Sequence, residues 1–329
     1  MRYLKYVVNN QFKDFLPEPG DFEIVHENVP PIKKGEFLVK ATFISTDPYL
    51  RSFANKRIVP YEQFGFQVGK VVESKHPDYP ATMNVVSHSG WRDYAVLNGE
   101  PDEIFSIKPY GAPVGNLPLS YAIGALGMPG MTAYLGLLEI CQPKEGDVVC
   151  VSSAAGAVGS LVGQIAKIKG CKVIGFAGTD QKVDMLRNEL KFDYAFNYKT
   201  EKDLKGAIRS VTPGIDCYFD NVGGTLSAHV MECMNENGRV AVCGSISMYG
   251  GNTSPRKKPR LPSSVKGVSF SFTQWDWAQQ TAALCQLKEW IEQGDIQVKE
   301  TIVKGFEELP NTFIDMLKGA NVGKTVVQV

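Results

Sequence analysis

The chain has 329 residues, a length that predicts about two domains. Its 35 lysines and arginines balance 35 aspartates and glutamates, so the formal net charge is zero, and we expect neither a nucleic-acid partner nor a membrane partner. Hydrophobic residues make up 43% and charged residues 21% of the chain, which excludes a globally disordered protein.

The sequence shows no disulfide framework, no local metal site and no targeting segment. Its seven cysteines are odd in number and scattered, without a C-x-x-C pair. The histidines do not stand with a cysteine at zinc-ligand spacing, so we expect no metal; they are His26, His76, His88 and His229. The first residues, MRYLKYVVNNQFKDF, lack the apolar core of a signal peptide. We therefore expect a cytoplasmic protein.

The N-terminal part of the chain, up to about residue 120, reads as a mostly antiparallel β domain. Short runs that alternate in hydrophobicity are broken by proline, glycine, asparagine and aspartate. The clearest of these runs are Glu36–Ile44, Phe66–Glu73 and Arg92–Leu97.

From residue 147 onward, apolar strands alternate with helices, which indicates a parallel sheet covered on both faces. The expected strands are 147–153, 172–178, 194–198, 215–221 and 239–245, and the expected helices are 157–169, 181–190, 201–211 and 226–235. A strand at 267–272 and a helix at 277–293, with Trp277 and Trp290 on a buried face, continue the pattern. This order predicts a doubly wound dinucleotide-binding fold. Residues 298–329 return to β-like runs, and we expect this tail to rejoin the first domain.

A glycine-rich turn, Ser152–Gly159, follows the first of these strands and precedes a helix. In a dinucleotide fingerprint, Gly156 lets the backbone approach a pyrophosphate and Gly159 lets the helix pack closely on the strand. The free N–H groups of the helix N-terminus would meet the phosphate charge. A turn that serves packing alone is the alternative, and the surrounding strand–helix alternation disfavours it.

The end of the second strand indicates which nucleotide is bound. An NAD-preferring fold places an acidic residue there, but this strand ends at Gly178 and Thr179. Asp180 resembles the N-cap of the next helix, and Lys182 lies in the first turn of that helix. A neutral strand end beside a cation suits a 2′-phosphate, which favours NADP(H); the alternative is that Lys182 is one more solvated lysine.

Several ordered motifs together resemble the medium-chain dehydrogenase/reductase superfamily, and within it the zinc-independent leukotriene B4 dehydrogenase branch. The motifs are Asp47-Pro48-Tyr49, Gly127–Tyr134, Ala154–Gly159, Phe196-Asn197-Tyr198-Lys199, Phe219–Gly224, Cys243–Ser247 and Asn321–Lys324. The resemblance implies an α/β protein with two domains. One is a GroES-like β-rich catalytic domain at 1–122, to which 298–329 returns; the other is a Rossmann NADP-binding domain at 123–297.

The resemblance also implies a set of cofactor contacts at the carboxyl ends of the strands. They are Ala155, Gly156, Ala157, Val158, Gly159, Lys182, Tyr198, Asn221, Cys243, Gly244, Ser245, Ile246, Ser247, Met248, Tyr249, Phe270, Ser271, Phe272 and Asn321. For Tyr198 a packing role and for Asn221 a turn role remain as alternatives, and Cys243 is expected to be a small buried residue that offers only its backbone.

The activity implied by the resemblance is NADPH-dependent reduction of the C=C bond of a small-molecule enone or enal, an eicosanoid among the candidates. Reverse oxidation of an allylic alcohol such as leukotriene B4 is also implied. The hydroxyls of Tyr49 and Tyr249 and the ribose hydroxyl of the cofactor are candidates to stabilise the enolate or supply the proton; each tyrosine has a packing alternative. A homodimer is expected from the family. A quinone reductase, a zinc-free alcohol dehydrogenase, and an NADPH-binding redox sensor or structural protein with little turnover remain open.

One segment departs from the family pattern. Family members often carry a tyrosine in the loop before the strand at 267–272, whereas residues 250–264 contain none and Pro262 stands in its place. Residues 255–262 are rich in proline and carry Arg256, Lys257, Lys258 and Arg260. This basic segment is a lid that attracts a substrate carboxylate, a solvated loop or, the least favoured interpretation, a nuclear-localisation signal.

Overall fold

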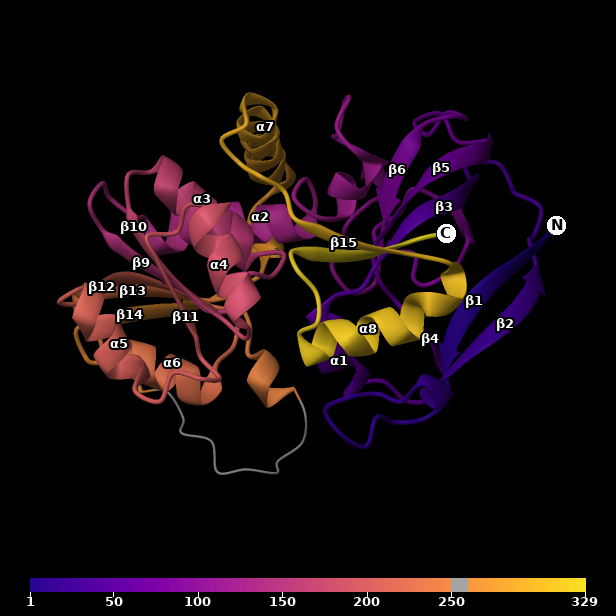
Figure 1. Ribbon diagram of the computed structural model, residues 1–329. Helices are drawn as coiled ribbons and strands as arrows, with labels where there is room; N and C mark the ends of the chain where they lie inside the picture. Colours follow the sequence, from indigo (N-terminus) through magenta and orange to yellow (C-terminus); the bar gives the residue numbers. More distant parts are fainter. Residues whose placement is uncertain (250–259) are drawn as a thin grey trace. The chain divides into compact units, whose positions relative to one another are not determined.

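The computed structural model describes residues 1–249 and 260–329, which form two compact units. A β-rich unit consists of residues 1–123, 301–321 and 325–329, and a second unit consists of residues 124–300 and 322–324. Figure 1 labels most elements of both units. Within residues 1–249 and 260–329, no helix is long and apolar enough to cross a membrane.

The β-rich unit contains two sheets. One has the order β2-β1-β4, and the other has the order β15-β16-β3-β5-β6-β8, with β7 also paired to β3. The strands are β1 (Arg2–Val8), β2 (Phe22–Asn28), β3 (Phe37–Ser45), β4 (Tyr61–Glu62), β5 (Gln67–Ser74), β6 (Asn84–Ser87), β7 (Tyr94–Leu97), β8 (Tyr110–Gly111), β15 (Glu300–Lys304) and β16 (Lys324–Gln328). The pairs β1–β2 and β3–β5 are antiparallel, as the alternating runs predict.

The C-terminal tail contributes strands to this unit, and β16 pairs antiparallel with β3, Val326 opposite Ser45. In Figure 1 the yellow tail lies beside the indigo strand β3. The expectation of β-like runs throughout 298–329 is wrong for α8 (Leu309–Lys318). Leu309, Phe313 and Leu317 are buried along one face of α8, since their spacing of four residues matches the helical period.

The core of the β-rich unit is aromatic. Trp91 is fully buried, stacks on Phe22 at a centroid distance of 5.6 Å and meets Phe313 edge-on at 5.8 Å. Its indole N–H donates to the carbonyl of Ser45 at 3.2 Å, so the polar atom of this large side chain is satisfied inside the core.

The second unit is a doubly wound α/β domain around a six-stranded sheet with the order β11-β10-β9-β12-β13-β14. All its neighbouring strands pair in parallel. The strands are β9 (Val148–Val151), β10 (Lys172–Ala177), β11 (Tyr194–Asn197), β12 (Ile215–Asp220), β13 (Met234–Val242) and β14 (Lys266–Ser269). In chain order this is 3-2-1-4-5-6, so the expected fold class, a β-rich domain with a doubly wound Rossmann domain, is confirmed.

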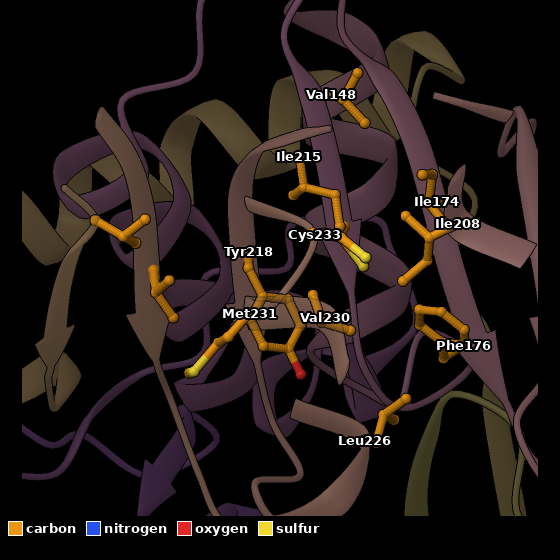
Figure 2. Packing of buried hydrophobic residues seen from close by; sticks show 13 residues of the cluster. Val148, Ile174, Phe176, Ile208, Ile215, Tyr218, Leu226, Val230, Met231 and Cys233 are labelled. Carbon is orange, nitrogen blue, oxygen red and sulfur yellow. The ribbon is translucent and has the colours of Figure 1, made fainter. Parts of the chain in front are cut away.

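The helices of this unit are α2 (Met128–Leu135), α3 (Gly159–Ile168), α4 (Asp180–Asn188), α5 (Leu204–Val211), α6 (Gly224–Met231) and α7 (Trp277–Gln293), and α1 (Pro48–Ala54) belongs to the β-rich unit. Helices α3 and α4 lie on one face of the sheet and α5 and α6 on the other (Figure 1). Figure 2 shows the core beneath α5 and α6, where Phe176 and Tyr218 from the strands meet Ile208, Leu226 and Val230 from the helices.

Several expected bounds are wrong. The helix expected over 226–235 ends at Met231, since Met234 already pairs with Ile215 as the start of β13. The strand expected over 267–272 ends at Ser269, and Phe272 begins a short 3₁₀ helix. The expected bounds of α7 are confirmed, but Trp277 on that helix is 48% exposed, whereas Trp290 is buried.

Candidate functional site

The glycine-rich turn joins the buried strand β9 to α3. A glycine is required at position 159 because the backbone of Ser153 and Ala154 lies too close for a side chain. A Cβ atom on Gly159 would lie 2.3 Å from the carbonyl oxygen of Ser153 and 2.8 Å from the Cα atom of Ala154. A Cβ atom on Gly156 would lie 3.1 Å from the Ser153 hydroxyl oxygen, a tight but less severe contact. Gly159 therefore fixes the distance between the start of α3 and the turn.

The same turn presents polar backbone groups at the N-terminus of α3. Within the part of the chain that the structure describes, the N–H groups of Ala157 and Val158 have no protein acceptor. The carbonyl of Ala155 accepts the Gly323 N–H at 2.8 Å, so the tail segment 322–324 packs against the turn. Asn321 directly precedes this segment and belongs to the β-rich unit. A helix N-terminus with spare N–H groups is suited to an anion.

Two lysines lie together at the carboxyl ends of β10 and β11. Partial burial and the positive charge of Lys199 lower the pKa of Lys182. A Cβ atom on Gly178 would lie 3.2 Å from Cε of Lys199 and 3.3 Å from the hydroxyl oxygen of Tyr198. Lys199 was not among the cofactor contacts expected from the sequence, although it follows Tyr198 in the motif Phe196–Lys199. The two ammonium groups and the tyrosine form a candidate 2′-phosphate site.

The residue that caps α4 differs from the expectation. Thr179, and not Asp180, is the N-cap, because the Thr179 hydroxyl accepts the Lys182 N–H at 3.3 Å. Asp180 lies in the first turn of the helix and accepts a hydrogen bond from the Asn197 amide at 2.7 Å. This contact occupies the Asp180 carboxylate at the end of β11.

The ends of β9 and β12 are joined by a buried polar network. The Asn221 side-chain amide donates to the Ser152 carbonyl at 2.8 Å, and the Asn221 backbone N–H donates to the Ser152 hydroxyl at 2.9 Å. Asp220 is buried and accepts hydrogen bonds from the Tyr218 hydroxyl and the Gly223 N–H, both at 2.9 Å. Asn221 thus joins the ends of β9 and β12 through its backbone N–H and its side-chain amide nitrogen. Its side-chain oxygen takes no part in these hydrogen bonds.

The segment after β13 folds back on the same edge of the sheet. The N–H groups of Cys243 and Gly244 donate to the Asp220 carbonyl at 2.9 and 3.1 Å, and the Ser247 hydroxyl donates to the Val222 carbonyl at 2.7 Å. Ser245 precedes a 3₁₀ helix, Ile246–Met248, in which Met248 is 48% exposed. Burial, with a smaller contribution from the Asp220 charge, raises the pKa of the Cys243 thiol to about 12, so the thiol stays protonated.

Tyr249 is the last described residue of this segment, and its side chain lies near the end of β13. Its hydroxyl oxygen would lie 3.4 Å from a Cβ atom on Gly244. Burial raises the pKa of Tyr249, while a hydrogen bond from the Ser245 backbone acts in the opposite direction. The hydroxyl therefore remains protonated and lies at the carboxyl edge of β13.

The aromatic residues after β14 are packed. The Phe270 ring contacts Phe219 and Trp275 at centroid distances of 5.9 Å each. Phe272 is buried, and the Ser271 hydroxyl accepts the Thr273 N–H at 3.4 Å. Most of the basic segment, Arg256, Lys257 and Lys258 included, lies outside the described residues; Arg260 is exposed, and the Pro262 carbonyl accepts the Val265 N–H at 3.0 Å.

Tyr49 belongs to the β-rich unit and lies in the first turn of α1. Its hydroxyl lies 3.0 Å from Nε2 of His88, and Nδ1 of His88 lies 3.3 Å from a carboxylate oxygen of Asp102. Sequence reasoning considered His88 only as a metal ligand and did not single out Asp102. No local pattern could have found this chain of contacts, because its members come from three separate parts of the sequence.

The metal expectation stays a prediction. All seven cysteines are free thiols, and five of them are buried. Among residues 1–249 and 260–329, no group of three or more histidine, cysteine, aspartate or glutamate side chains could hold a metal ion.

Two family models match the chain. The model described as "N-terminal domain of oxidoreductase" matches residues 5–105, and the model described as "Zinc-binding dehydrogenase" matches residues 157–285. Prostaglandin reductase 1 of Oryctolagus cuniculus is 46% identical over 315 residues, which cover 94% of this chain and 88% of the rabbit protein. The NADP(+)-dependent 2-alkenal reductase of Nicotiana tabacum is 37% identical, with 99% of this chain and 97% of the tobacco protein covered.

A solved structure agrees with these relatives. CurA of Vibrio vulnificus, crystallised in complex with NADPH, superposes with a TM-score of 0.88 at 34% identity and covers 100% of this chain and 99% of that chain. The family that the motifs predict is confirmed: the protein belongs to the prostaglandin reductase 1 family of the medium-chain dehydrogenase/reductase superfamily.

Proposed function

We propose that the protein is an NADPH-dependent reductase of α,β-unsaturated ketones and aldehydes. The observation that carries the proposal is the Lys182–Lys199 pair beside the glycine-rich turn, in a chain whose relatives include a prostaglandin reductase and a 2-alkenal reductase. The turn fits a dinucleotide, and the lysine pair fits the extra phosphate that distinguishes NADP from NAD.

The residues of the second unit fit the cofactor on structural grounds. The close contacts leave no room for a side chain at Gly159 and little room at Gly156, so a pyrophosphate can approach the backbone of the turn there. Lys182 and Lys199 would bind the 2′-phosphate, with Tyr198 beside them. Asn221 and the segment Cys243–Tyr249 would border the ribose and the nicotinamide, and Asn321, Phe270, Ser271 and Phe272 complete the proposed set.

The bound cofactor supplies a hydride to the β-carbon of the substrate. Negative charge then develops on the substrate's carbonyl oxygen, and the α-carbon needs a proton. Two protonated phenols are available for these tasks, Tyr49 in the β-rich unit and Tyr249 at the end of β13. Each phenol is protonated at neutral pH and can donate a hydrogen bond, since the ordinary tyrosine pKa of 10.0 already lies well above 7 and burial raises it further.

The experiment is a substrate panel with purified protein, in which cofactor absorbance reports turnover. We expect rapid NADPH oxidation with a simple enone or a 2-alkenal, and little with NADH. A faster reaction with a quinone, or NADP reduction by an alcohol, would favour a quinone reductase or a zinc-free alcohol dehydrogenase. Tight NADPH binding without turnover on any substrate would favour the redox-sensor reading.

Substrate preference and oligomeric state need separate measurements. An oxidised eicosanoid that carries an enone tests whether such lipids are preferred over short enals, and leukotriene B4 with NADP tests the reverse oxidation. We also propose a homodimer in the cytoplasm. Light scattering should give twice the chain mass of 36.2 kDa, and a monomer at working concentrations would refute the dimer.

A further inference from the structure

His88 occupies a position in the β-rich unit where both its ring nitrogens face polar partners. Its side chain is only 2% exposed, and it follows directly after β6. Nε2 lies 3.0 Å from the Tyr49 hydroxyl and Nδ1 lies 3.3 Å from the Asp102 carboxylate. The rings of Phe64, Phe66 and Phe105 surround the imidazole at centroid distances of 6.3, 4.6 and 5.2 Å.

Asp102 is a fixed anchor for this histidine. One of its carboxylate oxygens accepts the N–H groups of Ile104 and Phe105, both at 2.8 Å, and the other accepts the N–H of Ile107 at 3.0 Å. Burial opposes ionisation, but the hydrogen bonds from His88 and from these backbone groups hold the pKa of Asp102 below its ordinary value. A fixed carboxylate opposite Nδ1 keeps a proton on that nitrogen, so the other nitrogen exchanges protons with Tyr49.

Tyr49 is oriented by its surroundings. Its ring contacts Phe53, Phe64 and Phe105, and the Phe66 backbone donates a hydrogen bond to its oxygen. Burial raises the pKa of the phenol well above its ordinary value, with the nearby charges of Asp47 and Asp102 adding to the effect. A phenol oxygen accepts two hydrogen bonds and donates one. When His88 carries a proton on Nε2, both acceptor positions are filled, so the Tyr49 proton points away from the histidine.

An open cavity of about 340 Å³ lies beside the histidine. His88, Asp102, Ser87 and Ser89 line it, so water can reach the relay pair without passing Tyr49. The charged side chains that line the same cavity are Arg57, Glu62, Arg92, Glu100 and Glu103.

We propose that Tyr49 is the general acid of the reduction and that Asp102 and His88 form a proton relay that reloads it. The proposal rests on the proposed function. Tyr49 gives its O–H proton to the α-carbon of the enolate, and a C–H bond forms as the O–H bond breaks. The phenolate takes the Nε2 proton of the imidazolium, and the neutral imidazole regains one proton from bulk solvent, which water in the cavity carries to the ring. The two electrons come from the hydride, so each turnover consumes NADPH and one proton.

In this relay Tyr49 touches the substrate, whereas His88 and Asp102 are positioning residues that act through it. The competing explanation is that the histidine only fills an aromatic core. The two differ in the effect of His88 variants on the pH profile of kcat: removal of a relay residue changes that profile, whereas removal of a packing residue leaves it unchanged.

The test compares Tyr49→Phe, His88→Gln and Asp102→Asn with two matched controls in the same unit. Tyr79→Phe removes another buried phenol, which donates to the Pro109 carbonyl at 2.7 Å, and His76→Gln removes another ring packed on aromatic neighbours. We expect kcat to fall about 100-fold in Tyr49→Phe, the lower end of the range for loss of a general acid. In His88→Gln and Asp102→Asn, which act through Tyr49, we expect a fall of about 10-fold or more. The KM for NADPH and the kcat of both controls should stay within about twofold of the unmodified protein.

Two further readouts separate proton transfer from packing. The double variant Tyr49→Phe/His88→Gln should be no slower than Tyr49→Phe alone, because the two residues act in series. Imidazole added to His88→Ala should restore activity through the cavity, whereas pyrazole, of similar shape but far weaker base, should not. His88 variants that keep the kcat and pH profile of the unmodified protein would overturn the relay, as would a loss of kcat with an unchanged pH profile and no rescue.

The outcome also distinguishes this inference from the proposed function. An unmodified protein that oxidises NADPH with an enone, but whose variants behave like the controls, refutes the relay alone. An unmodified protein without enone reduction refutes the proposed function, and the relay falls with it.

Discussion

Lys182 and Lys199 come from different elements, the first turn of α4 and the loop after β11, yet the charge of Lys199 adds to partial burial in lowering the pKa of Lys182. Like charges held near each other are unfavourable unless an anion lies between them. Their place at the carboxyl edge of a doubly wound sheet is where such folds bind the adenosine part of a dinucleotide. We therefore propose that the nucleotide preference of the protein depends on this pair of cations.

The first prediction concerns this pair. Lys182→Ala should weaken NADPH binding by about 10- to 100-fold, the loss of one charged hydrogen bond, and should leave NADH binding within about twofold. Lys199→Ala should act in the same direction. Calorimetric titration of both nucleotides measures the ratio. Lys191→Ala, at the other end of α4, is the matched control, because its ammonium group donates to the Asn188 carbonyl at 2.6 Å. An equal loss for both nucleotides would show that Lys182 does not read the 2′-phosphate.

The second prediction concerns the glycine-rich turn. Gly159→Ala should lower the free energy of unfolding by about 1–3 kcal/mol, because the added Cβ meets the Ser153 carbonyl and the backbone must move. The displaced turn should also lose NADPH affinity. Urea unfolding and calorimetry measure the two effects. Gly20→Ala is the control, since nothing lies within 4 Å of its added Cβ. An unchanged free energy of unfolding in Gly159→Ala would mean that the turn can accommodate a Cβ atom without strain.

A third prediction concerns pH. Asp147 accepts hydrogen bonds from Arg239 at 2.5 Å and from the Lys144 N–H at 3.0 Å. Burial opposes ionisation, but these contacts lower the pKa of Asp147 below 3.8. A lowered pKa means that the carboxylate stabilises the fold above the unfolded-state value of 3.8 and that this stabilisation is lost as pH falls through the folded-state value.

Asp147→Asn should therefore lower the free energy of unfolding by about 1–2 kcal/mol at pH 7, and the difference should shrink below pH 4. Urea unfolding at a series of pH values tests this. Asp315→Asn breaks an exposed pair with Lys318 and should change stability by less than about 0.5 kcal/mol. A difference between Asp147→Asn and the unmodified protein that stays constant down to pH 3 would contradict the assignment.

The fourth prediction separates the two tyrosines. Tyr249→Phe removes a hydroxyl that the Ser245 backbone holds at the end of β13. If this hydroxyl stabilises the developing enolate, kcat should fall about tenfold or more while the dissociation constant of NADPH changes by no more than about twofold. Stopped-flow hydride transfer and nucleotide titration measure the two quantities, with the exposed Tyr194→Phe as the control. Weaker NADPH binding at an unchanged kcat would instead make Tyr249 part of the cofactor-site wall.

The sequence by itself determined the features that depend on neighbouring residues. The alternation of apolar strands and helices predicted the doubly wound sheet, and the expected bounds of α7 were right because its capping box, Asp276 with Gln279, is local. The glycine-rich turn was predictable for the same reason, since its close contacts lie within eight consecutive residues. The helix α8 was missed although the four-residue spacing of Leu309, Phe313 and Leu317 is present in the sequence, because β-branched runs flank it on both sides.

Tertiary structure decided which distant residues meet. Lys199 stands beside Lys182 only because β10 and β11 are neighbours in the sheet, and the strand order cannot be read from one strand alone. The contact between Tyr49 and His88 joins residues 39 positions apart, and the loop at Asp102 completes it through backbone hydrogen bonds. Hydrogen bonds reach about 3 Å, so a chain of them exists only where the fold sets each partner in place. Sequence patterns report which chemical groups are available, and packing decides which of them touch.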